Sequence, residues 1–284
     1  MAKAFGKFYK AVRHALIRLW ERWLAGVDAT NGPACDFWLV CHSKDWQTAV
    51  LTIASIRRYS LNPVRTIFLV GNESDRPRWV PDGVSYIFEG KLPAIGAALD
   101  VLKGVPFKGW VLQQVLKYSA VEYSDRFVAI DCDTVLIKPH LFFTDGGTIL
   151  RLAYEHSPHY RPFEKSLNAN GGRLFSFTCH MMPYKSVLLR GLMVRIEEIT
   201  GQNWVNYICD YAKQYGMVVN EQDLYARYIL QTSEMVQFRP WLNKTVALSE
   251  IDVINNLSVT FNDRNSVSFH NNDERKLVIG AIVK

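Results

Sequence analysis

Apolar segments of strand length alternate with amphipathic segments through the first half of this 284-residue chain. The apolar segments are short and rich in β-branched or aromatic residues, which is typical of buried strands. They comprise residues 36–41, 64–70, 84–88 and 126–130. Helical periodicity lies between them, at residues 45–59 and 109–123. Strands that alternate with helices favour a mostly parallel sheet with helices on both faces, so we expect an α/β, Rossmann-like fold.

Composition agrees with a folded body, because 49% of the residues are hydrophobic and 21% are charged. The second half of the chain predicts further elements. Strands are expected at 148–153, 173–178, 235–238 and 267–270, and helices at 185–199, 204–215 and from 221. We find no internal repeat and no low-complexity segment.

The formal charge of +6 is concentrated at the N-terminus. Residues 1–27 contain six Lys or Arg residues and a single acidic residue, Glu21, so the remaining chain is nearly neutral. A nucleic-acid-binding protein would be expected to carry a basic face on its folded body. The charge distribution therefore argues against a nucleic-acid partner.

Residues 1–30 predict a basic amphipathic helix. Its apolar stripe recurs at spacings of three and four residues and consists of Phe5, Phe8, Val12, Leu16, Leu19 and Trp23. The cations lie on the opposite face, an arrangement that suits a helix lying on an anionic membrane surface. A helix that packs on the protein's own body or on a second subunit is the alternative. Two Trp residues and few Ser residues are atypical of a mitochondrial presequence.

Five cysteines without a CxxC pair argue against a zinc ribbon or a disulfide framework and favour a reducing cytosol. No apolar run reaches the roughly 18 residues that a spanning helix needs. Residues 1–27 also lack the apolar stretch and cleavage site of a signal peptide. We expect a cytoplasmic protein that associates peripherally with the inner face of the cell membrane.

The segment RFVAIDCDTVLIKP, residues 126–139, carries the clearest chemical signal. An apolar strand runs directly into Asp131 and Asp133, whose side chains point to the same side of an extended chain. Open α/β sheets bind ligands at the carboxyl ends of their strands. Two carboxylates there suit Mn²⁺ or Mg²⁺ bound together with diphosphate oxygens. Such a cation would offset the charge of a departing nucleoside diphosphate.

With this segment the chain resembles the metal-dependent glycosyltransferases of the A-type, Asp-x-Asp fold, including poorly characterised bacterial families. The resemblance extends with gaps from residue 36 to about residue 270. It is carried by GWVLQQVLKYSA at 109–120, FVAIDCDTVLIKP at 127–139, NEQDLY at 220–225 and VSFHNN at 267–272. The Lys-Pro-Trp ending of the glycogenin-like families is absent after His270, and there is no Asn-Ser-Gly triplet.

The resemblance implies roles for individual residues. Asp131 and Asp133 would bind the metal and the diphosphate, and His270 would be the third metal ligand. Glu221 or Asp223 would contact the acceptor or act as a base. Ser43 would lie where the base and ribose are held.

Three further residues are candidates with ordinary alternatives. Asn170, in NANGG at 168–172, could hold the donor sugar, although this segment is first of all a turn. Lys117 either reaches a phosphate from its helix or is a solvated lysine. His180 either faces the substrates or is a loop histidine. Glu221 and Asp223 could equally be acids favoured by a helix N-terminus.

The resulting prediction is a glycosyltransferase body at 34–284, with a nucleotide-binding half at about 34–140 and an acceptor half at about 141–284. It would move a sugar from a nucleotide-sugar donor to a glycan or lipid-linked acceptor. Two alternatives remain. A haloacid-dehalogenase-type phosphatase would use Asp131 as nucleophile and Asp133 as general acid–base. A non-catalytic membrane-surface adaptor would use neither.

Overall fold

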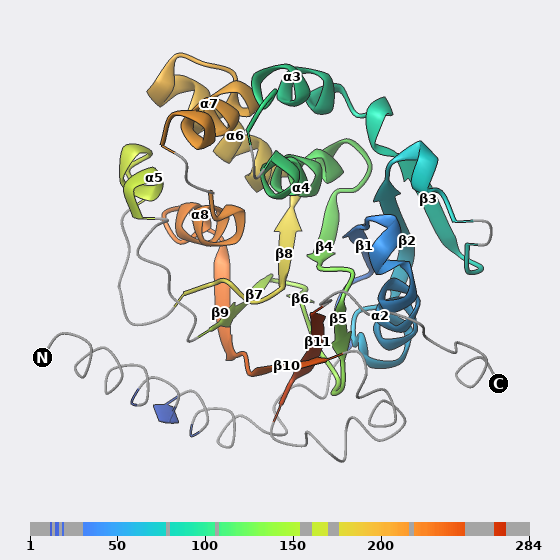
Figure 1. Ribbon diagram of the computed structural model, residues 1–284. Helices are drawn as coiled ribbons and strands as arrows, with labels where there is room; N and C mark the ends of the chain where they lie inside the picture. The colour runs from blue at the N-terminus through green and yellow to red at the C-terminus, as the bar shows by residue number, and fades with distance from the viewer. Residues whose placement is uncertain are drawn as a thin grey trace, which may run out of the picture.

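We describe a computed structural model of the chain (Figure 1). The described residues are 31–77, 80–105, 108–153, 161–169, 176–215, 219–247 and 264–270, together with Val12, Ala15, Leu16 and Leu19. Most of the predicted membrane-surface helix therefore lies outside the described residues, as does Asn170. Among the residues that the structure describes, no helix combines the length and apolar character required to span a membrane.

A five-stranded sheet forms the centre of the molecule, with the order β3-β2-β1-β4-β8. Its strands are β1 (Cys35–Val40), β2 (Val64–Gly71), β3 (Val84–Phe88), β4 (Arg126–Ile130) and β8 (Met181–Lys185). The first four are parallel, and β8 pairs with β4 in the antiparallel direction at one edge. This is the mixed, mostly parallel arrangement that the alternation of strands and helices predicted.

Helices cover both faces of the sheet (Figure 1). They are α2 (Trp46–Tyr59), α3 (Pro93–Val101), α4 (Lys108–Tyr118), α5 (Arg161–Ser166), α6 (Ser186–Thr200), α7 (Trp204–Tyr215) and α8 (Glu221–Ile229). Local sequence explains several of their ends. Pro93 occupies the first turn of α3, where its missing N–H costs nothing. Gly201 ends α6 with φ of 68°, a left-handed conformation that glycine adopts without strain.

The alternation of side chains along the strands separates two hydrophobic cores. On one face, Trp38, Ala129 and Tyr184 pack with residues of α3, α4, α6, α7 and α8. On the other face, Leu39 and Ile130 pack with residues of α2. Neighbouring residues such as Trp38 and Leu39 therefore face opposite cores, as the two-residue period of a strand requires.

Two three-stranded sheets extend the fold. One has the order β10-β11-β5, and the other has the order β6-β7-β9. Their strands are β5 (Thr134–Leu136), β6 (Phe143–Thr144), β7 (Gly147–Leu152), β9 (Met235–Pro240), β10 (Asn243–Ala247) and β11 (Ser266–His270). Only three residues separate β4 from β5. The sheet with the order β10-β11-β5 therefore adjoins the carboxyl end of β4 in the central sheet.

The strand predicted at 173–178 is wrong in its described part. Ser176 forms an isolated bridge with Ala153, and Phe177 and Thr178 belong to no strand. The strand in this part of the chain is β8, which begins at Met181, three residues after the end of the predicted segment.

Candidate metal and nucleotide site

The register of β4 and β8 brings Asp131 and His180 together. Ile130, the last residue of β4, pairs with Met181, the first residue of β8. In an antiparallel pair the residue after one strand lies beside the residue before the other. The backbone N–H of Asp131 accordingly donates to the carbonyl of His180 at 2.9 Å. The imidazole Nδ1 of His180 lies 3.3 Å from Oδ2 of Asp131.

Asp133 reaches the same place from the start of β5. The N–H of Thr134 donates to the carbonyl of Asp131 at 3.0 Å, which turns the chain between the two aspartates. The carbonyl of Asp133 accepts from the N–H of Phe269 in β11 at 2.9 Å. Backbone contacts on both sides thus fix the position from which the Asp133 side chain projects.

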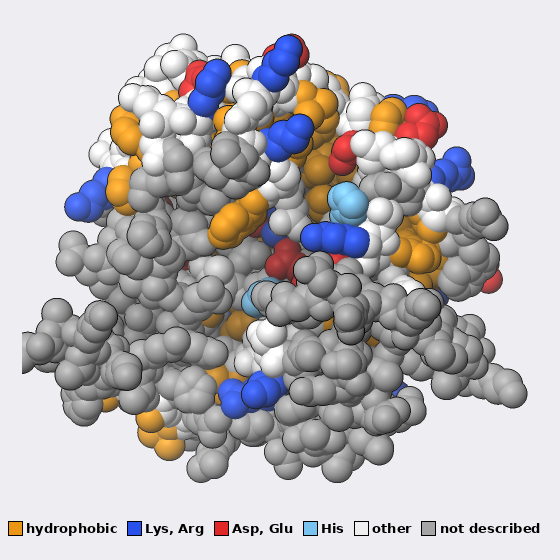
Figure 2. Space-filling model, in the orientation of Figure 1, with side chains coloured by type: hydrophobic (Ala, Val, Ile, Leu, Met, Phe, Trp, Pro, Cys, Tyr) orange, Lys and Arg blue, Asp and Glu red, His pale blue; other side chains and the backbone are white. Residues whose placement is uncertain are grey.

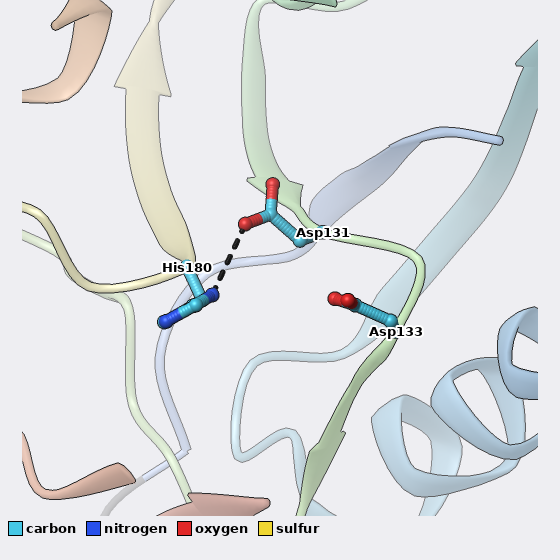
Figure 3. Close-up of side chains that lie close together, drawn as sticks. All are labelled: Asp131, Asp133 and His180. Atoms are coloured by element: carbon cyan, nitrogen blue, oxygen red, sulfur yellow. Dashed lines mark ion pairs between the residues drawn. The ribbon is translucent and has the colours of Figure 1, made fainter. Parts of the chain in front are cut away.

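Asp131, Asp133 and His180 offer one ligand atom each within 4.8 Å of one another. Figure 3 shows their side chains converging from the end of β4, the start of β5 and the residue before β8. Carboxylate oxygens suit Mg²⁺ and Mn²⁺, and imidazole suits the transition metals. Two carboxylates with one imidazole therefore fit Mn²⁺ well, and three protein ligands leave positions open for substrate oxygens.

His180 adopts an unusual backbone conformation, with φ of 56°. A side chain other than glycine in the left-handed region costs on the order of 1–3 kcal/mol and persists only where the surroundings enforce it. Such residues cluster at functional sites, so the strain supports a role for His180 beyond that of a loop histidine.

The N-terminus of α8 enforces this conformation. Asn220 caps the helix by accepting from the N–H groups of Gln222 and Asp223. The side chain of Gln222 accepts from the N–H of Cys179 at 2.9 Å, and Asp223 Oδ1 accepts from the N–H of Phe177 at 2.6 Å. These two side chains thus hold the segment that ends at His180. Asp223 is 2% exposed, and its burial raises the pKa of its carboxyl.

Lys117 of α4 lies behind the cluster. Its Nζ is 2.8 Å from Oδ1 of Asp131 and 2.9 Å from Oε1 of Glu221, and its side chain is only 7% exposed. Burial opposes the charged form of Lys117, but the two carboxylates outweigh it and raise the lysine's pKa. Burial likewise opposes ionisation of Asp131, yet Lys117 and His180 hold the pKa of that carboxyl below its usual range. Asp131 is therefore ionised at neutral pH, with Oδ2 turned toward His180.

A pocket of about 480 Å³ lies at the carboxyl ends of β1 and β2, beside Cys132. Its wall is completed by α4, which contributes Trp110 and Gln113. Figure 2 shows acidic and histidine side chains close together in a hollow near the middle of this face. The volume suits a small ligand such as a nucleoside, and the place agrees with the rule that open α/β sheets bind ligands at their carboxyl edge. The sequence singled out the segment that contains Trp110 and Gln113 but not these two residues, because only the packing of α4 against the sheet brings them to the pocket.

Comparison with known proteins gives structural likenesses only. No protein-family model and no curated protein match the chain. Mouse xyloside xylosyltransferase 1 in its apo form is 14% identical, with 86% of this chain and 99% of that chain covered and a TM-score of 0.45. Galactosyltransferase LgtC with donor and acceptor sugar analogues is 11% identical over 83% of this chain and 87% of that chain, with a TM-score of 0.43. An active-site mutant of LgtC is 12% identical over 84% of this chain and 88% of that chain, with a TM-score of 0.42. At such values the functional assignment depends on the site geometry of this chain.

The remaining predicted site residues occupy different positions. Ser43 is exposed in the short helix Ser43–Asp45, and its Oγ lies within hydrogen-bond distance of Nδ1 of His42, at 3.3 Å. Its neighbours His42, Lys44 and Asp45 line the pocket. His270 is the last residue of β11, but its side chain lies outside the description. The Nζ of Lys117 lies between two carboxylates and is not turned toward the pocket. This position does not provide a direct contact with a phosphate.

Proposed function

We propose that this chain is a metal-dependent glycosyltransferase that moves a sugar from a nucleotide-sugar donor to a glycan or lipid-linked acceptor in the assembly of cell-surface polysaccharide. The convergence of Asp131, Asp133 and His180 beside a nucleoside-sized pocket supports this proposal. The pocket would hold the nucleoside, and the cluster would hold a cation against the diphosphate. In this proposal His270, at the end of β11, would be a further metal ligand.

The division of labour follows from the contacts. Mn²⁺ or Mg²⁺ bound by Asp131, Asp133 and His180 would stabilise the charge of the departing diphosphate. Lys117 keeps Asp131 ionised and therefore able to act as a ligand. Glu221 orients Lys117, and Asp223 fixes the segment before His180, so in our proposal both are positioning residues. To bind the acceptor, Glu221 would have to give up its contact with Lys117.

The phosphatase hypothesis gains no support from the described residues. It requires the strand before Asp131 to open the fold, whereas β1, β2 and β3 come before β4 in the chain. In the described part of the chain, Asp131, Asp133 and His180 form the one cluster of three possible metal ligands. No described contact favours the non-catalytic adaptor either.

Nucleotide binding that depends on the metal tests the proposed function directly. Mn²⁺ together with the right nucleoside diphosphate or nucleotide sugar should raise the melting temperature. A ligand at 100 times its Kd stabilises the folded state by about 2.7 kcal/mol. A thermal-shift screen over a panel of nucleotides, with and without Mn²⁺, measures this effect. If no nucleotide gives a shift that needs Mn²⁺, but Mg²⁺ with fluoroberyllate does, the chain is a phosphatase instead.

We also propose that residues 1–27 attach the protein to an anionic membrane surface. Val12, Ala15, Leu16 and Leu19 are the described positions of this segment, and all are helical. Val12, Leu16 and Leu19 are 39%, 44% and 66% exposed, although they belong to the apolar stripe. An exposed apolar stripe in a segment that carries six Lys or Arg residues fits the headgroup region of a bilayer.

Removal of residues 1–27 should release the protein from vesicles of anionic lipid. Each basic residue near such a surface contributes about 1 kcal/mol, so the loss of six should abolish co-sedimentation at moderate salt. The nucleotide-dependent thermal shift of the truncated protein serves as the control for folding. Unchanged sedimentation after truncation would assign the helix to the protein body or to a subunit contact.

A further inference from the structure

Two cysteines lie just past the carboxyl ends of neighbouring strands, at the proposed nucleotide pocket. In the parallel pair of β1 and β4, Trp38 lies opposite Ala129. Cys41 directly follows Val40, the last residue of β1, and Cys132 lies two residues after Ile130, the last residue of β4. Cys41 is still tied to the sheet, since its N–H donates to the carbonyl of Val70 at 2.8 Å.

The two thiols point to the same side. Cys41 and Cys132 both belong to the core on the α2 face, as Leu39 and Ile130 do two residues earlier. Both also line the pocket, with exposed fractions of 8% and 6%. A hydrogen bond from Cys41, together with burial, raises the pKa of the Cys132 thiol well above its usual value. The two side chains are therefore in contact.

A disulfide requires two cysteines whose side chains meet and whose Cα atoms can come to about 4.4–6.8 Å, so thiols already in contact are the ones able to form it. We propose that Cys41 and Cys132 form a dithiol modification site in the nucleotide pocket, which a low-molecular-weight disulfide closes to a protein disulfide. The remaining cysteines, Cys35, Cys179 and Cys209, do not line this pocket.

The reaction consists of two thiol–disulfide exchanges. The first thiol loses its proton and attacks one sulfur of the small disulfide, which forms a mixed disulfide and releases one small thiol. The second cysteine then attacks the protein sulfur of that mixed disulfide and releases the other small thiol. The protein loses two protons and two electrons, and the small disulfide gains them.

Closure of the disulfide should weaken the metal site. Cys132 lies between Asp131 and Asp133, and its carbonyl accepts from Oγ1 of Thr52 at 2.9 Å. A bond from Cys132 to Cys41, which follows β1, ties the turn that spaces the two carboxylates. Loss of outer contacts at a metal site typically costs 10–100-fold in affinity, so we expect Mn²⁺ binding to fall by roughly tenfold or more. This consequence rests on the proposed metal site, whereas formation of the disulfide does not.

The test uses the full-length, reduced protein and hydroxyethyl disulfide as the oxidant. Peptide mapping by mass spectrometry should find a cross-link between Cys41 and Cys132, with Cys35, Cys179 and Cys209 still reduced. Mn²⁺ binding, followed by electron paramagnetic resonance without any nucleotide, should fall by about tenfold or more and recover after dithiothreitol. The Cys41→Ala and Cys132→Ala variants should form no such cross-link and keep their Mn²⁺ affinity under the same treatment.

Two results would overturn the inference. One is native protein in which Cys41 and Cys132 stay unlinked while the oxidant is in excess. The other is a cross-linked protein with undiminished Mn²⁺ affinity. If the reduced protein binds no Mn²⁺ at all, the proposed function fails, but the cross-link still decides whether the dithiol site exists.

Discussion

Replacing Asp133 by Ala is expected to abolish metal-dependent glycosyl transfer while leaving the protein folded. The backbone of Asp133 keeps its contact with Phe269, because that bond uses the carbonyl and not the side chain. What the variant loses is one of the two carboxylates that would hold the cation. Metal stabilisation of transition-state charge is worth several kcal/mol, and about 4 kcal/mol corresponds to roughly a thousandfold in rate.

Asp133 separates catalysis from stability better than Asp131 does. Asp131 pairs with Lys117, so its removal would also disturb a buried ion pair. Asp210 provides the matched control, because it is an exposed aspartate on α7. Asp210→Ala removes one negative charge, as Asp133→Ala does. Turnover with each candidate donor and Mn²⁺ is the measurement, with circular dichroism to confirm the fold. Near-normal turnover by Asp133→Ala would show that the metal is held elsewhere.

The first four strands of the central sheet could be predicted because each is a short segment rich in apolar, β-branched or aromatic residues. The predicted strand at 84–88 matches β3, and that at 126–130 matches β4, residue for residue. The helix at 204–215 also matches α7. Each segment is bounded by polar or turn residues, so local composition alone was enough to place it.

β8 could not be predicted in the same way, and with it the position of His180. The segment MMPYK contains Pro183, which normally argues against a strand. Here β8 forms the edge of the sheet, where a residue without an N–H is tolerated. The neighbourhood of Asp131 and His180 depends on this edge pairing, so the sequence named both residues without bringing them together.

Spacing in the sequence was sufficient for local parts of the site and insufficient for the distant ones. Asp131 and Asp133 are two residues apart, and the two-residue period of an extended chain places them together. Lys117 and Glu221 are 104 positions apart, and only the packing of α4 beside the start of α8 creates their ion pair. Gln222 was missed, because an uncharged amide beside two acids gives no signal until its acceptor oxygen is seen to hold the N–H of Cys179.

Replacing Lys117 by Met is expected to destabilise the whole protein. Methionine keeps the length of the side chain but removes the charge that lies between Asp131 and Glu221. The Glu221 side chain is 7% exposed and that of Asp131 is 24% exposed, so solvent screens them poorly. Breaking a buried ion pair from one side typically costs about 3–5 kcal/mol, because the remaining charge is left without a partner. Denaturant unfolding at neutral pH measures this loss directly.

The loss should depend on pH with a defined sign. In the wild-type protein the pKa of Asp131 is depressed, so its stabilising effect is present above the unfolded-state pKa and is lost as pH falls through the folded-state value. The pKa of Lys117 is raised, so its effect is complete at neutral pH and is lost only as pH rises through its folded-state value. In the Met variant, acid should protonate one of the two facing carboxylates and relieve their repulsion. The stability gap between wild type and variant should therefore narrow as pH falls toward about 4, the ordinary range of carboxyl groups.

A compensating substitution distinguishes the ion pair from simple packing. Glu221→Gln has nearly the same shape as glutamate and removes the second negative charge, so Lys117→Met combined with Glu221→Gln should recover part of the stability lost in Lys117→Met. Coupling between residues in contact is usually about 0.5–3 kcal/mol, which a double-mutant cycle resolves. Additive effects in that cycle, or an unchanged unfolding midpoint for Lys117→Met, would show that the three charges do not stabilise one another. If the double variant regains stability but binds Mn²⁺ weakly, the two roles of Lys117 are separate. Asp131 would then lack the lysine charge that keeps its carboxyl ionised.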